Sequence, residues 1–387
     1  MAELLIRNAL VKGALCDILV SGDRIKAVGH DLRAEGAEII EQNGNVVIPG
    51  FVDCHAHLDK CHLNDGGRSR YVHGTGAVKG ALTRDQKALF TVEDIKQRAS
   101  LVLDTAVRSG TLVMRTNCDV DPIVGLKGIE ALLALREEYK DRLRLQVAAF
   151  AQEGVFQAPE TPKLLEEALR MGADLIGGHT ITCGEGERHI DFILELAAKY
   201  GVEADCHLDE SGNRENYLLP YTVNRMAELG LNGRVNGIHM CTLAALTDEE
   251  LTDALRLIRE SGLKATIAPT AISTRKIAPV KKLLEAGIPV GLGSDNIRDF
   301  FNPYGSGNIR HIASLLCYLQ AFFTDEEASQ IWNMITYGGA SVLGDAAYGI
   351  FAGAPADLTL FDSSEIREIL AEQSDPALLI RAGKKLI

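Results

Sequence analysis

The sequence lacks several features that mark whole classes of protein. Its 387 residues carry 40 Lys and Arg against 53 Asp and Glu, a formal net charge of −13, so there is no basic surplus for binding nucleic acid. No run approaches the ~20 apolar residues of a membrane span, and the first residues do not have the pattern of a signal peptide. We therefore expect a cytoplasmic protein that binds neither nucleic acid nor membranes.

Two short motifs are also missing. The eight cysteines are scattered without a Cys-x-x-Cys pair, which argues against a disulfide framework and against a cysteine-type zinc site. No Gly-x-Gly-x-x-Gly motif opens the first strand–helix unit, so dinucleotide binding has no support. What is present is a chain with 46% apolar residues, long enough for one large catalytic domain and a smaller one.

The middle of the chain, from about residue 51 to 345, alternates strand and helix signals. Eight strand-like runs follow one another, and most have a helix-length segment behind them. This alternation implies a parallel sheet, and eight units fit a closed (β/α)8 barrel of the TIM type, with an open doubly wound sheet as the alternative. The eight runs lie near 51–57, 111–116, 143–150, 175–178, 202–205, 235–238, 264–268 and 290–293.

Both ends of the chain differ from this middle part. Residues 1–50 alternate short β-like runs with turns, and further runs occur at 356–361 and 377–381. We therefore predict an α/β protein with two domains. A small β-sandwich domain would be built from residues 1–50 and 346–387, and the catalytic barrel would span 51–345.

The strongest chemical signal is His55-Ala56-His57, which directly follows an apolar run. Alternate residues of a strand point to the same side, so both imidazoles would face one point, where neutral imidazoles are good metal ligands. Taken alone, two structural histidines would explain the motif equally well. Three later strand-like runs also end in residues of this chemistry, namely His207 with Glu210, His239, and Asp295.

In a barrel these strand ends meet at one rim, where barrel enzymes have their active sites. Three imidazoles and one carboxylate suit Zn²⁺ or Fe²⁺, and Mn²⁺ is possible. Such an ion lowers the pKa of a bound water from ~15.7 to about 7. Glu210 lies three residues after His207 and could carry a proton from that water to a leaving nitrogen. His239 would be a ligand or a hydrogen-bonding partner of the hydroxide, and Asp295 a ligand or an ordinary turn residue.

The other histidines and one lysine are interpreted as structural. Lys60 follows Asp59 closely, and a salt bridge is preferred over a carboxylated lysine that bridges two metals, because such a lysine usually comes from a strand in the middle of the barrel. The histidines interpreted as ordinary are His62, His73, His179, His189 and His311.

The chain resembles the amidohydrolase superfamily and, more narrowly, its cytosine deaminase-like branch. Five segments carry this resemblance, and they occur in order along most of the chain. They are the Pro49-Gly50-Phe51-Val52 lead-in to His-x-His-Leu-Asp, Arg115–Asp121, Ala149–Gly154, His207–Glu210 and Asn302–Gly305.

The resemblance implies one mononuclear metal site and a role for each site residue. Glu210 would be the proton shuttle, His239 would polarise the attacking hydroxide, and the aspartate among the ligands would also accept a proton from the water. The reaction would be attack of hydroxide at the ring carbon that bears the exocyclic amine, followed by loss of ammonia. The ligands of the ion would be His55, His57, His207 and Asp295.

The resemblance also implies contacts with a flat heterocyclic substrate. Gln152 matches an amide that pairs with a ring carbonyl and the adjacent ring nitrogen, since an amide carries both a donor and an acceptor. Phe150 and Phe301 would line an apolar slot for the ring. Gly76 aligns with a leucine of cytosine deaminase, and its small size would leave room for a ring substituent. We therefore expect deamination of cytosine or, as the favoured substrate, 5-methylcytosine.

Two positions depart from the cytosine deaminases. Asn296 stands where those enzymes have a second Asp that contacts the substrate, and the segment 294–300 is similar to the N-isopropylammelide aminohydrolases of s-triazine breakdown. Those enzymes lack the Glu that is Glu210 here, so the retained shuttle favours a pyrimidine-like ring. Asn117 replaces a His that both relatives share, and the sequence offers no account of it.

Three other functions remain open. The same fold and metal could serve another cyclic amidine, such as an ammelide-type s-triazine or creatinine. A non-catalytic amidohydrolase scaffold would be expected to lose metal ligands, whereas every ligand position is filled here. A dihydroorotase-like two-metal amidase would need a bridging lysine on a strand. A small heterocycle is thus the expected partner, and a homo-oligomer is expected because relatives often assemble.

Overall fold

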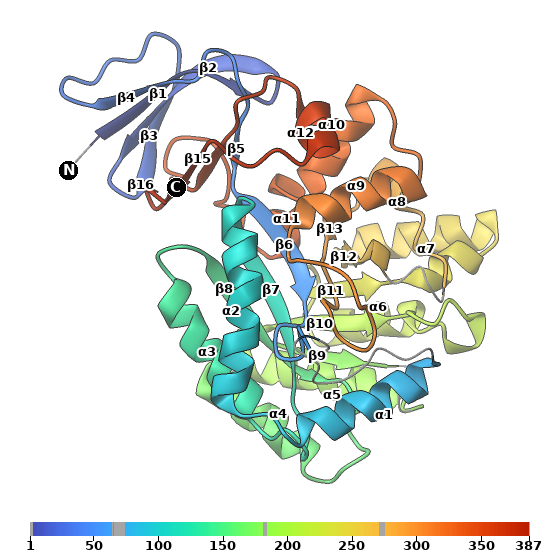
Figure 1. Ribbon diagram of the computed structural model, residues 1–387. Coiled ribbons are helices and arrows are strands. Elements are labelled where there is room, and N and C mark those ends of the chain that lie inside the picture. Colours follow the sequence, from blue (N-terminus) through green and yellow to red (C-terminus); the bar gives the residue numbers. More distant parts are fainter. Residues whose placement is uncertain (1–2, 64, 66–73, 181–183, 271–274, 387) are drawn as a thin grey trace.

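An eight-stranded parallel sheet forms the centre of the molecule (Figure 1). The computed structural model describes residues 3–63, 65, 74–180, 184–270 and 275–386. The strands follow one another around the sheet in chain order. They are β6 (Phe51–Ala56), β7 (Thr111–Asp119), β8 (Arg144–Ala151), β9 (Leu175–His179), β10 (Glu203–Leu208), β11 (Val235–His239), β12 (Lys264–Ile267) and β13 (Val290–Leu292).

The sheet closes on itself at the predicted metal site. Ala56 of β6 forms a parallel bridge with Asp295, which follows β13, and the Asp295 amide donates a 2.9 Å hydrogen bond to the carbonyl of His55. The predicted (β/α)8 barrel is therefore confirmed, and the alternative of an open doubly wound sheet is wrong. All eight strand-like runs of the sequence correspond to these eight strands.

Helices lie between successive strands and surround the barrel, as Figure 1 shows. Their buried residues recur at helical spacing, for example Ile95, Ala99, Val102 and Ala106 on the second helix, so one face of each packs on the sheet. The helices are α1 (Gly76–Lys87), α2 (Val92–Arg108), α3 (Lys127–Tyr139), α4 (Thr161–Met171), α5 (Glu187–Tyr200), α6 (Leu219–Glu228), α7 (Asp248–Ser261), α8 (Val280–Glu285), α9 (Ile309–Leu319), α10 (Asp325–Met334), α11 (Tyr337–Val342) and α12 (Ile366–Glu372), with short 3₁₀ helices at Arg214–Asn216 and Cys241–Ala245.

The two ends of the chain build a small β-sandwich, as expected. One sheet has the order β3-β2-β1-β4 and the other β16-β15-β14-β5. They enclose a separate apolar core to which both contribute, with Ile6 and Ile18 from one sheet and Leu358 and Ile380 from the other. The strands are β1 (Glu3–Val11), β2 (Ala14–Ser21), β3 (Arg24–Gly29), β4 (Glu38–Glu41), β5 (Val47–Pro49), β14 (Leu358–Leu360), β15 (Leu378–Arg381) and β16 (Lys384–Lys385).

A buried charge network links the strands of the barrel across its interior. Arg115 of β7 is 1% exposed and donates to Gln146 of β8 and to Glu203 and Asp205 of β10, at 2.8–2.9 Å. Removing one partner of such a network would leave a buried charge uncompensated. Because Asp205 precedes His207 by two residues on the same strand, the network also fixes the position of a predicted metal ligand.

The sequence shows no membrane span and no pattern of a disulfide framework, and both points can be compared with the described residues. None of the helices among them has the length and apolar character needed to cross a bilayer. The seven cysteines that the structure describes are all free thiols, and five of these are buried. Cys54 and Cys206, which precede candidate ligands, have raised thiol pKa values because burial disfavours the thiolate, and therefore act as small buried groups.

Candidate active site

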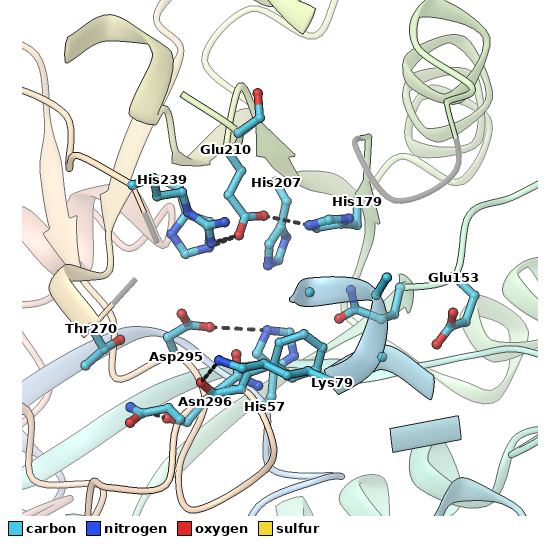
Figure 2. Close-up of a pocket in the computed structure, with 18 of the residues that line it drawn as sticks. His57, Lys79, Glu153, His179, His207, Glu210, His239, Thr270, Asp295 and Asn296 are labelled. Atoms are coloured by element: carbon cyan, nitrogen blue, oxygen red, sulfur yellow. Dashed lines mark hydrogen bonds and ion pairs between the residues drawn. The ribbon is translucent and has the colours of Figure 1, made fainter. Parts of the chain in front are cut away.

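A cavity of about 590 Å³ opens at the carboxyl ends of the barrel strands (Figure 2). Its size lies within the usual range of small-molecule sites. In Figure 1, α1 lies on the far side of the barrel from the sandwich domain, and five residues of α1 line this cavity. The residues expected from the sequence that line it are His57, Gly76, Gln152, His207, Glu210, His239, Asp295, Asn296 and Phe301.

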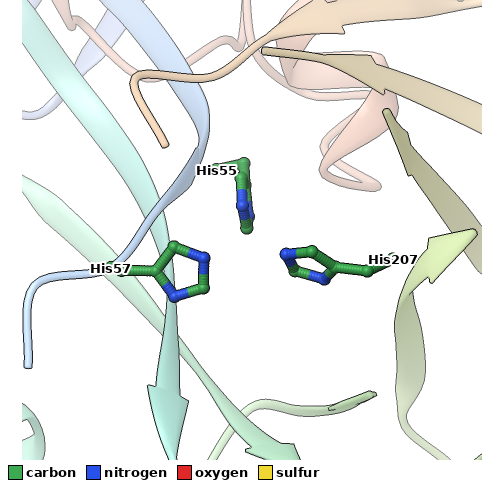
Figure 3. A group of neighbouring side chains, drawn as sticks. All are labelled: His55, His57 and His207. Atoms are coloured by element: carbon green, nitrogen blue, oxygen red, sulfur yellow. The ribbon is translucent and has the colours of Figure 1, made fainter. Parts of the chain in front are cut away.

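Three imidazoles point toward one another at this end of the barrel, as Figure 3 shows. One ring nitrogen of each of His55, His57 and His207 lies within 4.8 Å of the others, and all three side chains are buried. Asp295 joins them, with its Oδ1 atom 3.3 Å from His55 Nε2 and 3.5 Å from His57 Nε2. The structure thus brings together every ligand predicted from sequence.

The imidazoles are held in the form that binds metals. Burial lowers the pKa of His57 and of His207 well below the ordinary value, and neighbouring positive charge, including Lys60 near His57, lowers it further. Burial likewise lowers the pKa of His239 to about 4. These three rings are therefore neutral at pH 7 and have a nitrogen lone pair available.

Asn117 orients one of these rings through its backbone. His57 Nδ1 lies 3.2 Å from the carbonyl oxygen of Asn117, so Nδ1 carries the proton and Nε2 is left for the ion. The Asn117 side chain is fully buried, and neither polar atom of its amide has a hydrogen-bond partner among the described residues. No account of this position comes from the sequence, and the structure supplies one for the main chain only.

The residues present fit a divalent ion. Ligand atoms ~2.1 Å from a tetrahedral ion lie about 3.4 Å from one another, close to the separations of Asp295 from His55 and His57. Nδ1 of His207 and both ring nitrogens of His55 are buried and have no hydrogen-bond partner within the described ranges. Such orphaned nitrogens are costly unless something binds them.

Asp53 holds the two strand ends that carry ligands. Its Oδ1 accepts hydrogen bonds from the amides of His55 and Ser294, and Oδ2 accepts one from the Ser294 hydroxyl. Burial raises the pKa of Asp53 to about 6, although these hydrogen bonds favour its charged form. The first and last strands of the barrel are thereby fixed next to His55 and Asp295.

Glu210 lies at the opposite wall of the cavity from Asp295, between two imidazoles (Figure 2). Its Oε2 is 2.7 Å from His179 Nε2, and its Oε1 pairs with Arg275 and lies 3.9 Å from His239 Nε2. Burial raises the pKa of this carboxyl group, but the nearby His239, His179 and Arg275 outweigh that effect and hold it well below the usual range. Glu210 is therefore a carboxylate at neutral pH.

Several strand ends turn sharply into the site. His239 and Asp295 have φ values of +71° and +58°, and Asp209, between His207 and Glu210, has +52°. Non-glycine residues rarely adopt this left-handed conformation, and it recurs at functional sites. The carboxylate of Asp209 stabilises its turn by accepting the amides of Leu218 and Leu219.

The expected substrate-contacting residues fall into two groups. Gln152, Asn296, Phe301 and Gly76 line the cavity. Phe150 does not, and its ring is fully buried against the imidazoles of His207 and His57, with centroids 4.6 and 5.4 Å apart. The expectation that Phe150 lines a slot for the ring is corrected, because its position on β8 directs it behind the metal histidines.

Asn296 is tied to the loop after β13. Its Nδ2 donates to Asp299, whose other oxygen accepts the amides of Phe301 and Asn302. This turn shapes the side of the cavity next to Asp295. Burial raises the pKa of Asp299 to about 7.

Sequence reasoning missed several residues of the cavity, and two of them contact Glu210. His179, interpreted as ordinary, ends β9 in register with His207 and contacts Glu210. Its place at the end of a barrel strand was the signal available. Arg275 lies in an irregular segment after β12, where no periodic pattern identifies it.

The other residues interpreted as structural are mostly placed as expected. Lys60 pairs with Asp119 at 2.6 Å, which confirms a salt bridge. His189 pairs with Glu185 at 3.0 Å in the core, and His62 with Asp65 at 2.6 Å. Outside the cavity lie His62, His189 and His311, while His73 lies outside the described residues.

Comparisons with known proteins agree with this geometry. The chain is 35% identical, over 100% of its length and 97% of the relative, to N-isopropylammelide isopropyl amidohydrolase of Pseudomonas sp. (strain ADP). The structure matches N-isopropylammelide isopropylaminohydrolase of Burkholderia multivorans with a TM-score of 0.91 and 31% identity, covering 100% of this chain and 98% of that one.

A second similar structure is 5-methylcytosine deaminase of Klebsiella pneumoniae liganded with 5-fluorocytosine. It matches with a TM-score of 0.91 and 26% identity, covering 99% of this chain and 97% of that one. The model of the amidohydrolase family matches residues 38–384. The chain therefore belongs to the amidohydrolase family, and the resemblance seen in its sequence is confirmed.

Proposed function

We propose that this enzyme is a metal-dependent hydrolytic deaminase of cytosine or a substituted cytosine, with 5-methylcytosine as the favoured substrate. The observation that carries the proposal is the placement of Glu210, a buried carboxylate that faces Asp295 across the cavity. A reaction that expels ammonia needs such a proton carrier beside the attacking water. The similarity to a 5-methylcytosine deaminase supports the same reading.

The metal site would be formed by residues already brought together. His55, His57, His207 and Asp295 would hold one divalent ion, Fe²⁺ or Zn²⁺, with Mn²⁺ also possible. When bound, the ion lowers the pKa of a water molecule to about 7, so that hydroxide is available at neutral pH.

The side chains around the site then move protons and orient the ring. Asp295 accepts a proton from the water, and Glu210 carries a proton to the ring and to the leaving nitrogen. The neutral imidazole of His239 hydrogen-bonds the attacking oxygen. Gln152 holds the ring edge that carries the carbonyl. The oxygen of one water stays on the ring as a carbonyl, one of its protons ends on the adjacent ring nitrogen, and the other ends on the amino group, which leaves as ammonia.

A second candidate is the hydrolysis of an amino substituent from an s-triazine ring. It is favoured by the 35% identity to an N-isopropylammelide isopropyl amidohydrolase and by Asn296 beside Asp295. Retention of Glu210 favours the pyrimidine. Both candidates share the fold, the metal site and attack on a ring carbon that bears nitrogen.

The deciding experiment measures release of ammonia or alkylamine from a panel of rings. The panel holds cytosine, 5-methylcytosine, isocytosine, creatinine, ammelide and N-isopropylammelide, and the enzyme is loaded separately with Fe²⁺, Zn²⁺ and Mn²⁺. We expect turnover of cytosine rings, with 5-methylcytosine at least as good as cytosine. Activity confined to the triazines or to creatinine would overturn the proposal and support the alternative.

Gly76 offers a direct test of the preference for a substituted ring. It is the first residue of α1 and lines the cavity, and a Cβ atom built on it meets nothing within 4 Å. The substitution Gly76→Leu would fill space that a ring substituent needs. We expect kcat/KM for 5-methylcytosine to fall about 10-fold or more, the range found when one methyl group is discriminated, and cytosine to change much less.

Ala81→Leu is the matched control, because it adds bulk to the same helix at a position that does not line the cavity. Its kinetics with both substrates should stay near those of the unmodified enzyme. Equal losses on cytosine and 5-methylcytosine in Gly76→Leu would show that Gly76 does not select the substituent.

A further inference from the structure

Lys60 connects a buried charge cluster to the substrate cavity. Its side chain is completely buried, and its ammonium group donates to Asp119 Oδ1 at 2.6 Å and to Gln152 Oε1 at 3.1 Å. Asp119 is shared with a second buried lysine, Lys87, at 2.5 Å. Lys60 is therefore held in place on one side by a carboxylate and contacts the cavity-lining amide on the other.

This contact determines which way the amide of Gln152 faces. An ammonium group has three donors and no acceptor, so only the carbonyl oxygen of an amide can face it. With Oε1 directed at Lys60, the Nε2 group is directed elsewhere on a side chain that lines the cavity. If the amide were reversed, two donors would face each other next to a buried charge, and both would be unsatisfied.

We propose that Lys60 is a positioning residue that sets substrate specificity through Gln152. It holds the amide so that Nε2 offers an N–H donor to the ring, and the substrate must present a ring carbonyl at that edge. The inference rests on the proposed function for its substrate. The orientation of Gln152 itself follows from contacts among this chain's own residues.

Two lysines of one cluster provide a matched comparison. Lys60→Met and Lys87→Met each remove one buried positive charge beside Asp119, but Lys87 pairs with Asp121 and Glu153, whereas it is Lys60 that bonds Gln152. The substrate pair is cytosine and 4-aminopyrimidine, which lacks the ring carbonyl. Activity is measured for each variant as kcat and KM separately.

Lys60→Met is expected to lower kcat/KM for cytosine about 10-fold or more, mainly through KM, since an amide free to rotate no longer holds its N–H toward the ring. The preference for cytosine over 4-aminopyrimidine should fall by a similar factor. Lys87→Met should keep that preference within about 3-fold. Equal loss of preference in both variants would overturn the proposal, because it would assign the effect to the cluster's charge.

A double-mutant cycle tests whether Lys60 acts through Gln152. In a Gln152→Ala background, Lys60→Met should cost nothing further in KM, because the amide that it positions is absent. Additive losses would overturn the proposal. Gln152→Glu provides a variant that keeps a partner for Lys60 but removes the donor. It should fold and lose the preference for the carbonyl ring.

A spectroscopic readout separates this inference from the proposed function. The Gln152 side-chain NH₂ signals can be identified in ¹⁵N TROSY spectra by their loss in Gln152→Ala. Lys60→Met should shift them and Lys87→Met should not. If the Gln152 signals shift as expected but the enzyme deaminates no ring, the proposed deaminase function is overturned and the positioning role of Lys60 stands. Unchanged signals in Lys60→Met would overturn the positioning role even in an active enzyme.

Discussion

Replacing Glu210 by glutamine is expected to lower kcat by about 10²–10⁴-fold, the usual contribution of a general acid–base group. The carboxylate is 6% exposed and lies 2.7 Å from His179, so glutamine of nearly the same shape would remain in the same place. What it loses is the ability to take and return a proton. KM should change far less than kcat, because Glu210→Gln removes an interaction needed in the transition state.

The chain contains a second buried glutamate–histidine pair that serves as the control. Glu185 lies 3.0 Å from His189 and accepts the amides of Val155 and Phe156, and neither member of the pair lines the cavity. Glu185→Gln should therefore affect stability and leave kcat within a few-fold. Stopped-flow or steady-state ammonia release, with circular dichroism and metal analysis of each variant, makes the comparison. A Glu210→Gln enzyme with nearly normal kcat would show that another group moves the proton.

The electrostatics of Glu210 keep it ionised, as its proposed role as a base requires. Burial alone would raise the pKa of this carboxyl group, but the surrounding His239, His179 and Arg275 side chains lower it. His179 and Arg275 were not expected from the sequence. They nevertheless determine the position and the charge state of Glu210, which was expected. Arg275 in particular would have to release Glu210 for it to reach a substrate in the cavity, since it contacts Oε1 on the side of His239.

Much of the barrel could be predicted because its strands are apolar runs separated by helical patterns. The runs identified at 111–116 and 202–205 nevertheless ended too early. Strands β7 and β10 continue to Asp119 and Leu208, and the added residues include three buried polar side chains, Asn117, Asp119 and His207. Hydrophobic periodicity marks burial in an apolar core, so it fails where a strand enters a polar interior.

The candidate ligands were found because each lies at or just after the end of a strand, and strand ends of a barrel meet in space. Phe150 and His179 show the limit of that rule. Both are near strand ends, but Phe150 packs behind the imidazoles and His179 faces the cavity. The direction of each side chain depends on which face of its strand points into the barrel and on local packing. Residue type determines neither of these.

The second large effect concerns the metal. The enzyme is expected to contain about one divalent ion per chain, measured by inductively coupled plasma mass spectrometry, and chelation should abolish activity. Chelation should also lower Tm by several degrees, because an ion at 100 times its Kd stabilises the folded state by about 2.7 kcal/mol. Three imidazoles and Asp295 left without an ion would retain buried, unpaired nitrogens.

Single substitutions should separate ligands from neighbouring catalytic groups. His207→Asn is expected to lose the ion and with it all activity, whereas Glu210→Gln should keep the ion and lose only turnover. His189→Asn is the control, because this buried imidazole pairs with Glu185 away from the cavity.

His239 is the most informative position, since its ring lies 5.8 Å from that of His55 and it could complete a ligand set with Asp295. A His239→Asn enzyme that keeps one ion per chain and loses kcat would identify His239 as the group that polarises the attacking oxygen. Loss of the ion in this variant would instead make His239 a ligand and contradict the proposed division of roles.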